Sequence, residues 1–178
     1  MTSRGPEGDP RERKGQEPQS PQIGTEFDFG GVRERVVTRD DFPLERARQV
    51  LREETIAIIG YGVQGPAQGL NLKDNGFNVI VGQREGPTYD KAVADGWTPG
   101  VNLFSIEEAV KRATQPERPL RPGQVQYLLS DAGQKDQWTQ ILPLLRPGTN
   151  FYFSHGFSYT FSYQSAVVPP DDNDVTLV

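Results

Sequence analysis

The chain has 178 residues, of which 24 are acidic and 19 basic, so its formal net charge is -5 at pH 7. This acidic balance gives a nucleic-acid-binding role no electrostatic support, and no apolar stretch is long enough to cross a membrane. With no cysteine and one histidine, the chain can form neither a disulfide nor a metal site rich in cysteine or histidine. Its length fits one domain with a single core.

Residues 1–22 are polar and rich in proline, glycine and charges of both signs, which predicts a disordered tail. This stretch has no apolar region typical of a signal peptide, and its acidic residues argue against a transit peptide. We therefore expect a cytoplasmic protein. Residues 23–178 are expected to form the folded domain, beginning with a lead-in that becomes helical at Leu44.

The apolar run that follows Thr55, from Ile56 to Ile59, predicts a strand buried on both faces. Directly after it come Gly60, Tyr61, Gly62, Val63, Gln64 and Gly65, which have the G-x-G-x-x-G spacing of dinucleotide-binding turns. Pro66 suits the first turn of a helix, whose N-terminus would offer free N–H groups to a pyrophosphate. We prefer this interpretation to a plain glycine-rich turn, since the glycines lie between a strand and a helix.

Strands and helices then alternate along the chain. The expected helices are Pro66 to about Asn75, Tyr89–Asp95, Ser105–Arg112 and about Gln134 to Leu145, and the expected strands are Asn78–Val81, Val125–Leu129, Asn150–Phe153 and Asp174–Val178. Three prolines between Thr114 and Gly123 predict a surface loop there. The alternation predicts an α/β fold of the Rossmann type, with a doubly wound, mostly parallel sheet. Because the last expected strand ends the chain, we expect the polypeptide to be incomplete.

The end of the second strand of the predicted dinucleotide fold bears on the choice of cofactor. NAD-binding folds place an acidic residue there for the ribose 2′-hydroxyl, whereas this chain has Gln83 followed by Arg84. The guanidinium of Arg84 suits a 2′-phosphate, and Thr88 could add a hydroxyl donor, so the sequence favours NADPH over NADH. Two alternatives stay open: Glu85 could accept from a ribose hydroxyl, or these charges could be solvated loop residues.

Polar residues follow two further strands, at the edge where open α/β sheets bind ligands. One group is Ser130, Asp131, Ala132, Gly133 and Gln134, and the other contains His155. As the one histidine, and at a strand tip, His155 is a candidate for proton transfer, or equally a structural histidine bonded to loop carbonyls. Asp131 could contact the cofactor, although the cap of a helix is its commoner role.

Together these segments resemble ketol-acid reductoisomerase, also called acetohydroxy acid isomeroreductase, over about Phe27 to Val178. The matching stretches are Ile58–Gly65, Gln68–Gly76, Asn78–Arg84, Lys91-Ala92, Asp95–Trp97, Leu128–Asp131 with Gln134, Phe153–Phe157 and Pro169-Pro170. A set of ordered motifs of this kind is far more specific than the glycine spacing alone.

The resemblance implies an N-terminal NADPH-binding domain and a C-terminal helical domain that holds two Mg2+ ions and forms the subunit interface. The implied reaction is an alkyl migration in 2-acetolactate or 2-aceto-2-hydroxybutyrate, followed by hydride reduction to a 2,3-dihydroxy acid. Tyr61 to Gln64 would bind the pyrophosphate, Arg84 and Thr88 the 2′-phosphate, and Asp131 to Gln134 would line the nicotinamide side. His155 would be the active-site histidine.

The sequence departs from the family in three places. Residues 114–124 look like an insertion, Pro87 and Thr88 stand in a loop that is usually richer in serine, and the chain ends before the family's active-site lysine and helical domain. We therefore expect no metal ligands here and interpret Asp171, Asp172 and Asp174 as turn residues. The chain alone should be inactive. The expected macromolecular partners are a missing C-terminal half or further copies of the chain in a homo-oligomer. The rival hypotheses are a non-catalytic NADP-binding module, a decayed fragment and another Rossmann oxidoreductase.

Overall fold

The computed structural model describes residues 23–114 and 122–178, so the predicted tail and most of the predicted 114–123 loop lie outside the described residues. The chain divides into two compact units, one up to Pro43 and one from Leu44 onward. The first contains an antiparallel hairpin of β1 (Thr25–Asp28) and β2 (Arg33–Val36), closed by a bond from Phe29 N–H to the Val32 carbonyl at 2.8 Å. This hairpin was not predicted from the sequence, because its apolar residues do not alternate regularly.

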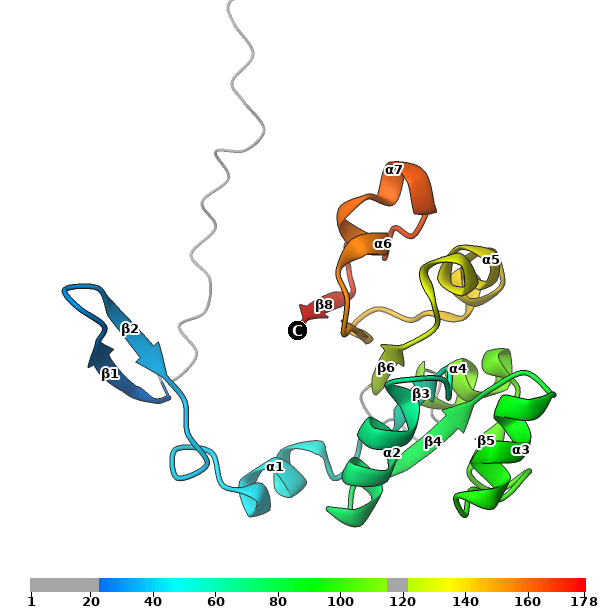
Figure 1. The fold of residues 1–178 in the computed structure, drawn as a ribbon, viewed down its shortest axis with the longest axis horizontal. Helices are drawn as coiled ribbons and strands as arrows, with labels where there is room; N and C mark the ends of the chain where they lie inside the picture. Colours follow the sequence, from blue (N-terminus) through cyan, green and yellow to red (C-terminus); the bar gives the residue numbers. More distant parts are fainter. Residues whose placement is uncertain (1–22, 115–121) are drawn as a thin grey trace, which may run out of the picture. The chain divides into compact units, whose positions relative to one another are not determined.

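The second unit is an α/β sandwich (Figure 1). Its elements are α1 (Leu44–Leu51), β3 (Ile56–Ile59), α2 (Gly65–Asp74), β4 (Val79–Gly82), α3 (Pro87–Ala94), β5 (Leu103–Phe104), α4 (Ile106–Thr114), β6 (Gln124–Tyr127), α5 (Asp131–Ile141), a 3-10 turn η2 (Leu142–Leu144), β7 (Asn150–Phe153), α6 (Phe157–Thr160), α7 (Ser162–Ser165) and β8 (Asp174–Leu177). The six strands pair in the order β5-β4-β3-β6-β7-β8, all parallel. The predicted Rossmann-type, doubly wound sheet is confirmed.

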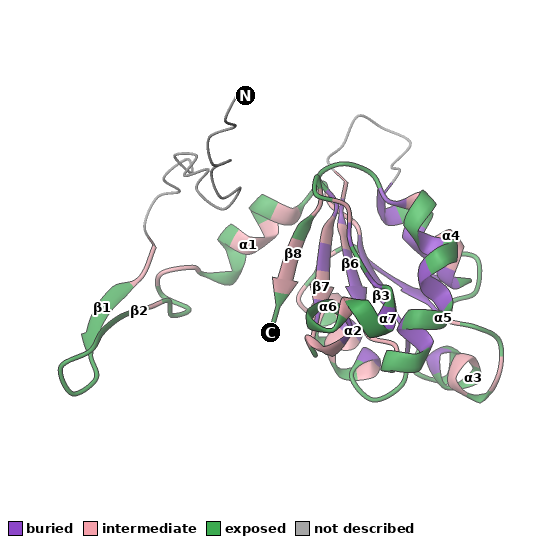
Figure 2. Ribbon diagram, turned by 90° about the horizontal axis from the view of Figure 1, so that it is seen from above, coloured by how far each residue is buried: buried purple, intermediate pink, exposed green. Residues whose placement is uncertain are grey.

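The central strand β3 explains why the sheet has a core on each face. All four of its residues are buried, and successive side chains point to opposite faces. Ile56 and Ile58 pack with Trp97 in one cluster, while Ala57 and Ile59 belong to a second cluster that contains α4 and the aromatic residues of β6 and β7. Figure 2 shows this burial along the strands and on the sheet-facing side of α4.

Several predicted boundaries differ from the structure. The helix expected from Gln134 begins at Asp131, and it gives way to the 3-10 turn at Leu142, one residue before Pro143. The two-residue strand β5 and the four-residue helices α6 and α7 were not predicted, because segments this short have no detectable periodicity. Asp171 and Asp172 lie in a turn before β8, as predicted, whereas Asp174 is the first residue of β8 and pairs with Asn150, so its interpretation as a turn residue is wrong. No helix in the described part of the chain has the length and apolar character to span a bilayer.

Candidate functional site

The winding of the chain identifies one edge of the sheet as the place for a ligand. From β3 the chain runs outward to β4 and β5 and then returns to form β6 on the other side of β3. Parallel open sheets bind ligands outside the carboxyl ends of their strands, at the point where the strand order reverses. Here that point lies between β3 and β6, next to the glycine loop 60–65.

The three glycines of this loop have different structural roles. Gly60 has φ +100°, and its N–H donates to the Gly82 carbonyl at 3.0 Å, so it turns the chain sharply at the end of β3. A Cβ on Gly65 would lie 2.2 Å from the Gly60 carbonyl oxygen, so the start of α2 packs directly on the turn. A Cβ on Gly62 would meet nothing within 4 Å. Gly62 therefore leaves open space where a phosphate group can approach the backbone.

The start of α2 has the properties of an anion site. Val63 is 93% exposed, and Gln64 is exposed too. Gln64 makes no side-chain capping bond to the helix, which continues with Pro66. The first N–H groups of α2 are thus left for a ligand, and the helix dipole favours a negative charge there.

Tyr61 has a different position from its neighbours in the loop. Its side chain is fully buried, and its hydroxyl donates to Asp95 Oδ2 at 3.0 Å and accepts from Trp97 Nε1 at 2.8 Å. Burial raises the pKa of the phenol to about 12, with the Asp95 carboxylate adding to the increase and the Trp97 bond opposing it. The Tyr61 N–H donates to Gln83 Oε1 at 2.8 Å. Tyr61 thus anchors the loop from inside, and neither its side chain nor its N–H faces a ligand.

Arg84 and Thr88 lie together beyond the end of β4. Residues 83–88 line a depression of about 310 Å³, in which Arg84 and Glu85 are exposed. Gly86, with φ +132°, leads into α3, whose N-terminus has no side-chain cap and begins with Pro87. Within the described residues neither Arg84 nor Glu85 forms an ion pair. A cation, a hydroxyl and a helix N-terminus therefore line one small hollow, with a carboxylate at its side.

The group after β6 separates into exposed and buried residues. Ser130, rather than Asp131, is the cap of α5, and its Oγ accepts from the Gly133 N–H at 3.3 Å. Asp131 and Ala132 are exposed in the first turn. Gln134 is buried, and its Nε2 donates to the carbonyls of Tyr127 and Leu129 at 3.2 and 2.9 Å. The Gln134 side chain therefore closes the end of β6, and a direct cofactor contact would require it to leave these bonds.

His155 is exposed, two residues beyond β7. The Phe157 N–H donates to its Nδ1 at a long 3.4 Å, and no bond to Nε2 is present among the described residues. Within the part of the chain that the structure describes, no hydrogen bond joins His155 to a loop carbonyl; its Nδ1 accepts from a loop amide instead. Nε2 stays available for a substrate.

Three polar residues of this edge were not among the predicted site residues. Gln83 holds the glycine loop, and Gln68 Nε2 donates to Ser154 Oγ at 2.7 Å, which connects α2 to the tip of β7. Gln83 and Ser154 stand next to predicted positions in the sequence, and Gln68 lies three residues after Gly65. Their position at strand tips or in the first turn of α2 was the signal that could have identified them.

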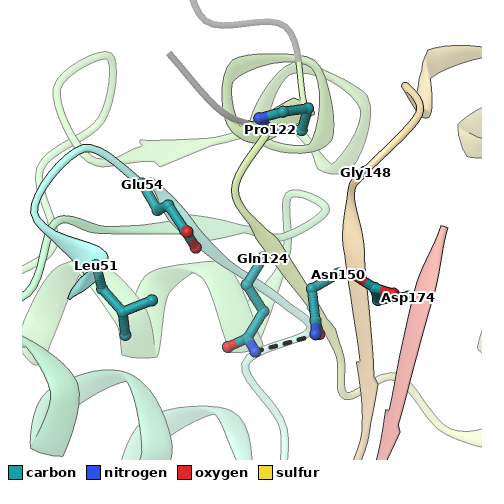
Figure 3. A pocket seen from close by; sticks show the side chains of 7 residues that line it. All are labelled: Leu51, Glu54, Pro122, Gln124, Gly148, Asn150 and Asp174. Atoms are coloured by element: carbon teal, nitrogen blue, oxygen red, sulfur yellow. Dashed lines mark hydrogen bonds between the residues drawn. The ribbon is translucent and has the colours of Figure 1, made fainter. Parts of the chain in front are cut away.

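A larger hollow of about 450 Å³ lies at the opposite edge of the sheet (Figure 3). It is lined by Leu51, Glu54, Pro122, Gln124, Gly148, Asn150 and Asp174, with a bond between Gln124 Nε2 and Asn150 Oδ1 at 3.3 Å. Gln124, Asn150 and Asp174 are the first residues of their strands, so this is the amino-terminal edge, where such folds do not bind dinucleotides. In the described ranges no three histidine, aspartate or glutamate side chains form a group that could hold a metal.

Comparison with known proteins gives consistent results. The sequence profile described as acetohydroxy acid isomeroreductase, NADPH-binding domain, matches residues 50–178. The chain is 52% identical over 153 residues to the ketol-acid reductoisomerase (NAD(+)) of Desulfosudis oleivorans, covering 85% of this chain and 41% of that protein. It is 47% identical over 154 residues to the mitochondrial ketol-acid reductoisomerase of Saccharomyces cerevisiae, covering 86% and 37%. The chain thus spans about two fifths of the length of these relatives.

Two solved structures are informative. A NADH-preferring ketol-acid reductoisomerase from an uncultured archean superposes with a TM-score of 0.58 at 35% identity, covering 72% of this chain and 36% of that one. A 3-hydroxyisobutyrate dehydrogenase of Mycobacterium tuberculosis superposes with a TM-score of 0.50 at 22% identity, covering 70% and 40%. At that identity the second match shows the fold alone.

Proposed function

Because the chain belongs to the ketol-acid reductoisomerase family, we propose that residues 23–178 form the NADPH-binding part of such an enzyme, in branched-chain amino-acid biosynthesis. The observation that carries this proposal is the glycine loop, in which Gly60 and Gly65 pack tightly while Gly62 leaves open space beside the start of α2. Close backbone approach at the second glycine is what pyrophosphate binding requires.

Each part of the dinucleotide has residues to hold it. The backbone of Gly62, Val63 and Gln64 and the first turn of α2 bind the pyrophosphate, while Arg84 and Thr88 bind the 2′-phosphate. The exposed first turn of α5, from Ser130 to Ala132, lines the nicotinamide side. When bound, the nicotinamide supplies the hydride.

His155 takes the role of a proton carrier in this proposal. Reduction of a ketone by hydride requires a proton at the carbonyl oxygen, and the exposed Nε2 of His155 can deliver it or hold the substrate oxygen by a hydrogen bond. The residues described here do not fit the two Mg2+ ions that the family resemblance implies, because they contain no metal-binding group. We therefore derive no metal-dependent step from this chain, and the substrates 2-acetolactate and 2-aceto-2-hydroxybutyrate stay part of the proposal.

A preference for NADH is the second candidate. The printed names of two similar proteins specify NAD(+) and NADH, and Glu85 lies beside Arg84 in the same depression. A carboxylate turned toward the ribose would accept from its 2′-hydroxyl and repel a 2′-phosphate. We favour NADPH because Arg84 has no carboxylate ion-paired to it in the described structure.

Titration of the purified chain with NADPH and NADH, followed by nicotinamide fluorescence, tests both candidates. We expect tighter binding of NADPH, and a loss of about tenfold in Arg84→Ala for NADPH alone, since a charge-assisted bond contributes ~1.5–3 kcal/mol. Tighter binding of NADH that weakens in Glu85→Gln would support the second candidate. No binding of either nucleotide would contradict a cofactor domain.

We also propose that residues 23–178 alone show no turnover with Mg2+ and NADPH, because the described residues contain no group that could hold the metal ions. A non-catalytic NADP-binding module would give the same cofactor binding. We further propose a cytoplasmic location, because the acidic residues Glu7, Asp9, Glu12 and Glu17 are atypical of a transit peptide. Fractionation of the source cells tests this location against a mitochondrial one, which the name of the yeast relative specifies for that protein.

A further inference from the structure

Gln83 is the residue that connects the two halves of the nucleotide site. It directly follows β4, where NAD-binding folds of this type place the acidic residue that holds the ribose. On one side its Oε1 accepts the Tyr61 N–H of the glycine loop at 2.8 Å. On the other side it lines the depression that contains Arg84 and Thr88.

The hydrogen bond to Tyr61 fixes which way the amide of Gln83 points. A backbone N–H can only donate, so the side-chain oxygen must face Tyr61 and the NH2 group must face away from it. Among the described residues that NH2 group has one long contact, to the Arg84 carbonyl at 3.4 Å. Its donors are therefore free for a ligand in the depression beside Arg84.

From this geometry we infer that Gln83 is a cofactor-binding residue, which donates from Nε2 to the 2′-substituent of the adenosine ribose while its oxygen holds the glycine loop. The inference rests on the proposed function, since it assigns a ligand contact within that site. A neutral donor is compatible with both forms of the cofactor, because a 2′-hydroxyl oxygen and a 2′-phosphate both accept. An acidic residue in the same place would accept from the hydroxyl and repel the phosphate.

The substitutions Gln83→Glu and Gln83→Leu separate the two tasks of the side chain. Glutamate keeps an acceptor for the Tyr61 N–H and replaces the donor by a charged acceptor. Leucine has a similar size and removes both functions. Gln140→Leu, at an exposed position on α5, is the matched control for replacing a glutamine by leucine.

The experiment is a titration of the wild type and the three variants with NADH and NADPH, with a thermal melt of each. We expect Gln83→Glu to keep NADH affinity within about threefold and to lose at least tenfold for NADPH. Gln83→Leu should weaken both cofactors about fivefold, and Gln140→Leu neither. A role limited to holding the loop would leave the ratio of the two affinities unchanged in Gln83→Glu, which would overturn the inference. If the wild type binds neither nucleotide, that result contradicts the proposed function and therefore also this inference.

Discussion

Gln68 and Ser154 lie 86 positions apart in the chain and share a hydrogen bond of 2.7 Å from Nε2 to Oγ. Gln68 is in the first turn of α2, three residues after the last glycine of the loop, and Ser154 immediately precedes His155. The Ser154 hydroxyl also contacts the Tyr152 hydroxyl, at 3.4 Å. One side-chain contact thus holds the proposed phosphate-binding helix and the strand tip bearing His155 in a fixed relation.

We expect this contact to be measurable as a coupling energy. Gln68→Leu and Ser154→Ala should each reduce the free energy of unfolding, and the two losses should not add in the double variant. The interaction energy should be ~1 kcal/mol, the usual net value of a hydrogen bond. Urea unfolding of the wild type, the single variants and the double variant measures it. Simple additivity within about 0.3 kcal/mol would show that the bond contributes nothing.

The glycine loop should respond to alanine in opposite ways at its second and third glycines. Gly62 has open space at its Cβ position and no positive φ, so Gly62→Ala should fold normally but weaken binding of both nicotinamide cofactors at least tenfold. Gly65→Ala would press a methyl group against the Gly60 carbonyl, so it should lose ~3 kcal/mol or more of stability, as steric overpacking does. Thermal melts together with cofactor titrations distinguish the two.

Each glycine variant serves as the control for the other. A Gly62→Ala protein that binds cofactor like the wild type would show that the open space beside the loop is not the cofactor site. A Gly65→Ala protein with an unchanged melting temperature would show that the tight contact with Gly60 can relax without cost.

The alternation of apolar strands and helices was sufficient to predict the parallel sheet, because β3 and β4 are buried on both faces and read as continuous apolar runs. The hairpin of the first unit was missed for the opposite reason. Its residues are almost all exposed, so no burial pattern marks them in the sequence. Its two turn glycines, Gly30 and Gly31, both have positive φ and were the available signal.

The position of the candidate site was predictable from the sequence, but the direction of each of its side chains was not. The spacing of Gly60, Gly62 and Gly65 located the loop, since backbone geometry follows from residue type at such turns. Whether Tyr61 faces a ligand or the core depends on Asp95 and Trp97, which lie 34 and 36 positions further along the chain. Gln134 instead turns back to the carbonyls of Tyr127 and Leu129, seven and five positions before it. Residue type alone specifies neither contact.

Tyr61→Phe should lower the free energy of unfolding at neutral pH. It should also make that free energy depend less on pH above 10. The phenol has a pKa near 12 in the folded protein, raised mainly by burial from an ordinary value of 10.0. Below pH 10 the phenol stays protonated in the folded and the unfolded chain, so its full contribution to the free energy of unfolding is present. Between pH 10 and 12 the unfolded chain releases the proton and the folded chain retains it, so stability falls by up to ~1.4 kcal/mol per pH unit.

Urea unfolding of wild type and Tyr61→Phe from pH 8 to 11.5 tests this prediction. At pH 8 the variant should be less stable by ~1–2 kcal/mol, because the buried Trp97 N–H loses its acceptor. The difference should shrink as the pH rises through 10. An equal difference at every pH would show that Tyr61 ionises as readily in the folded chain as in the unfolded one.

Ser130 and Asp131 should differ in their effect on α5, although either could serve as a cap by residue type. Ser130 Oγ accepts the Gly133 N–H, whereas Asp131 is the first helical residue and acts on the helix only through its charge. Ser130→Ala should therefore cost ~0.5–1 kcal/mol of unfolding free energy, near the low end for lost caps because the bond is 3.3 Å long. Asp131→Asn should cost less than ~0.5 kcal/mol, a loss that disappears at high salt. Urea unfolding at low and at high ionic strength measures both. A larger, salt-independent loss in Asp131→Asn would make Asp131 the true cap of the helix.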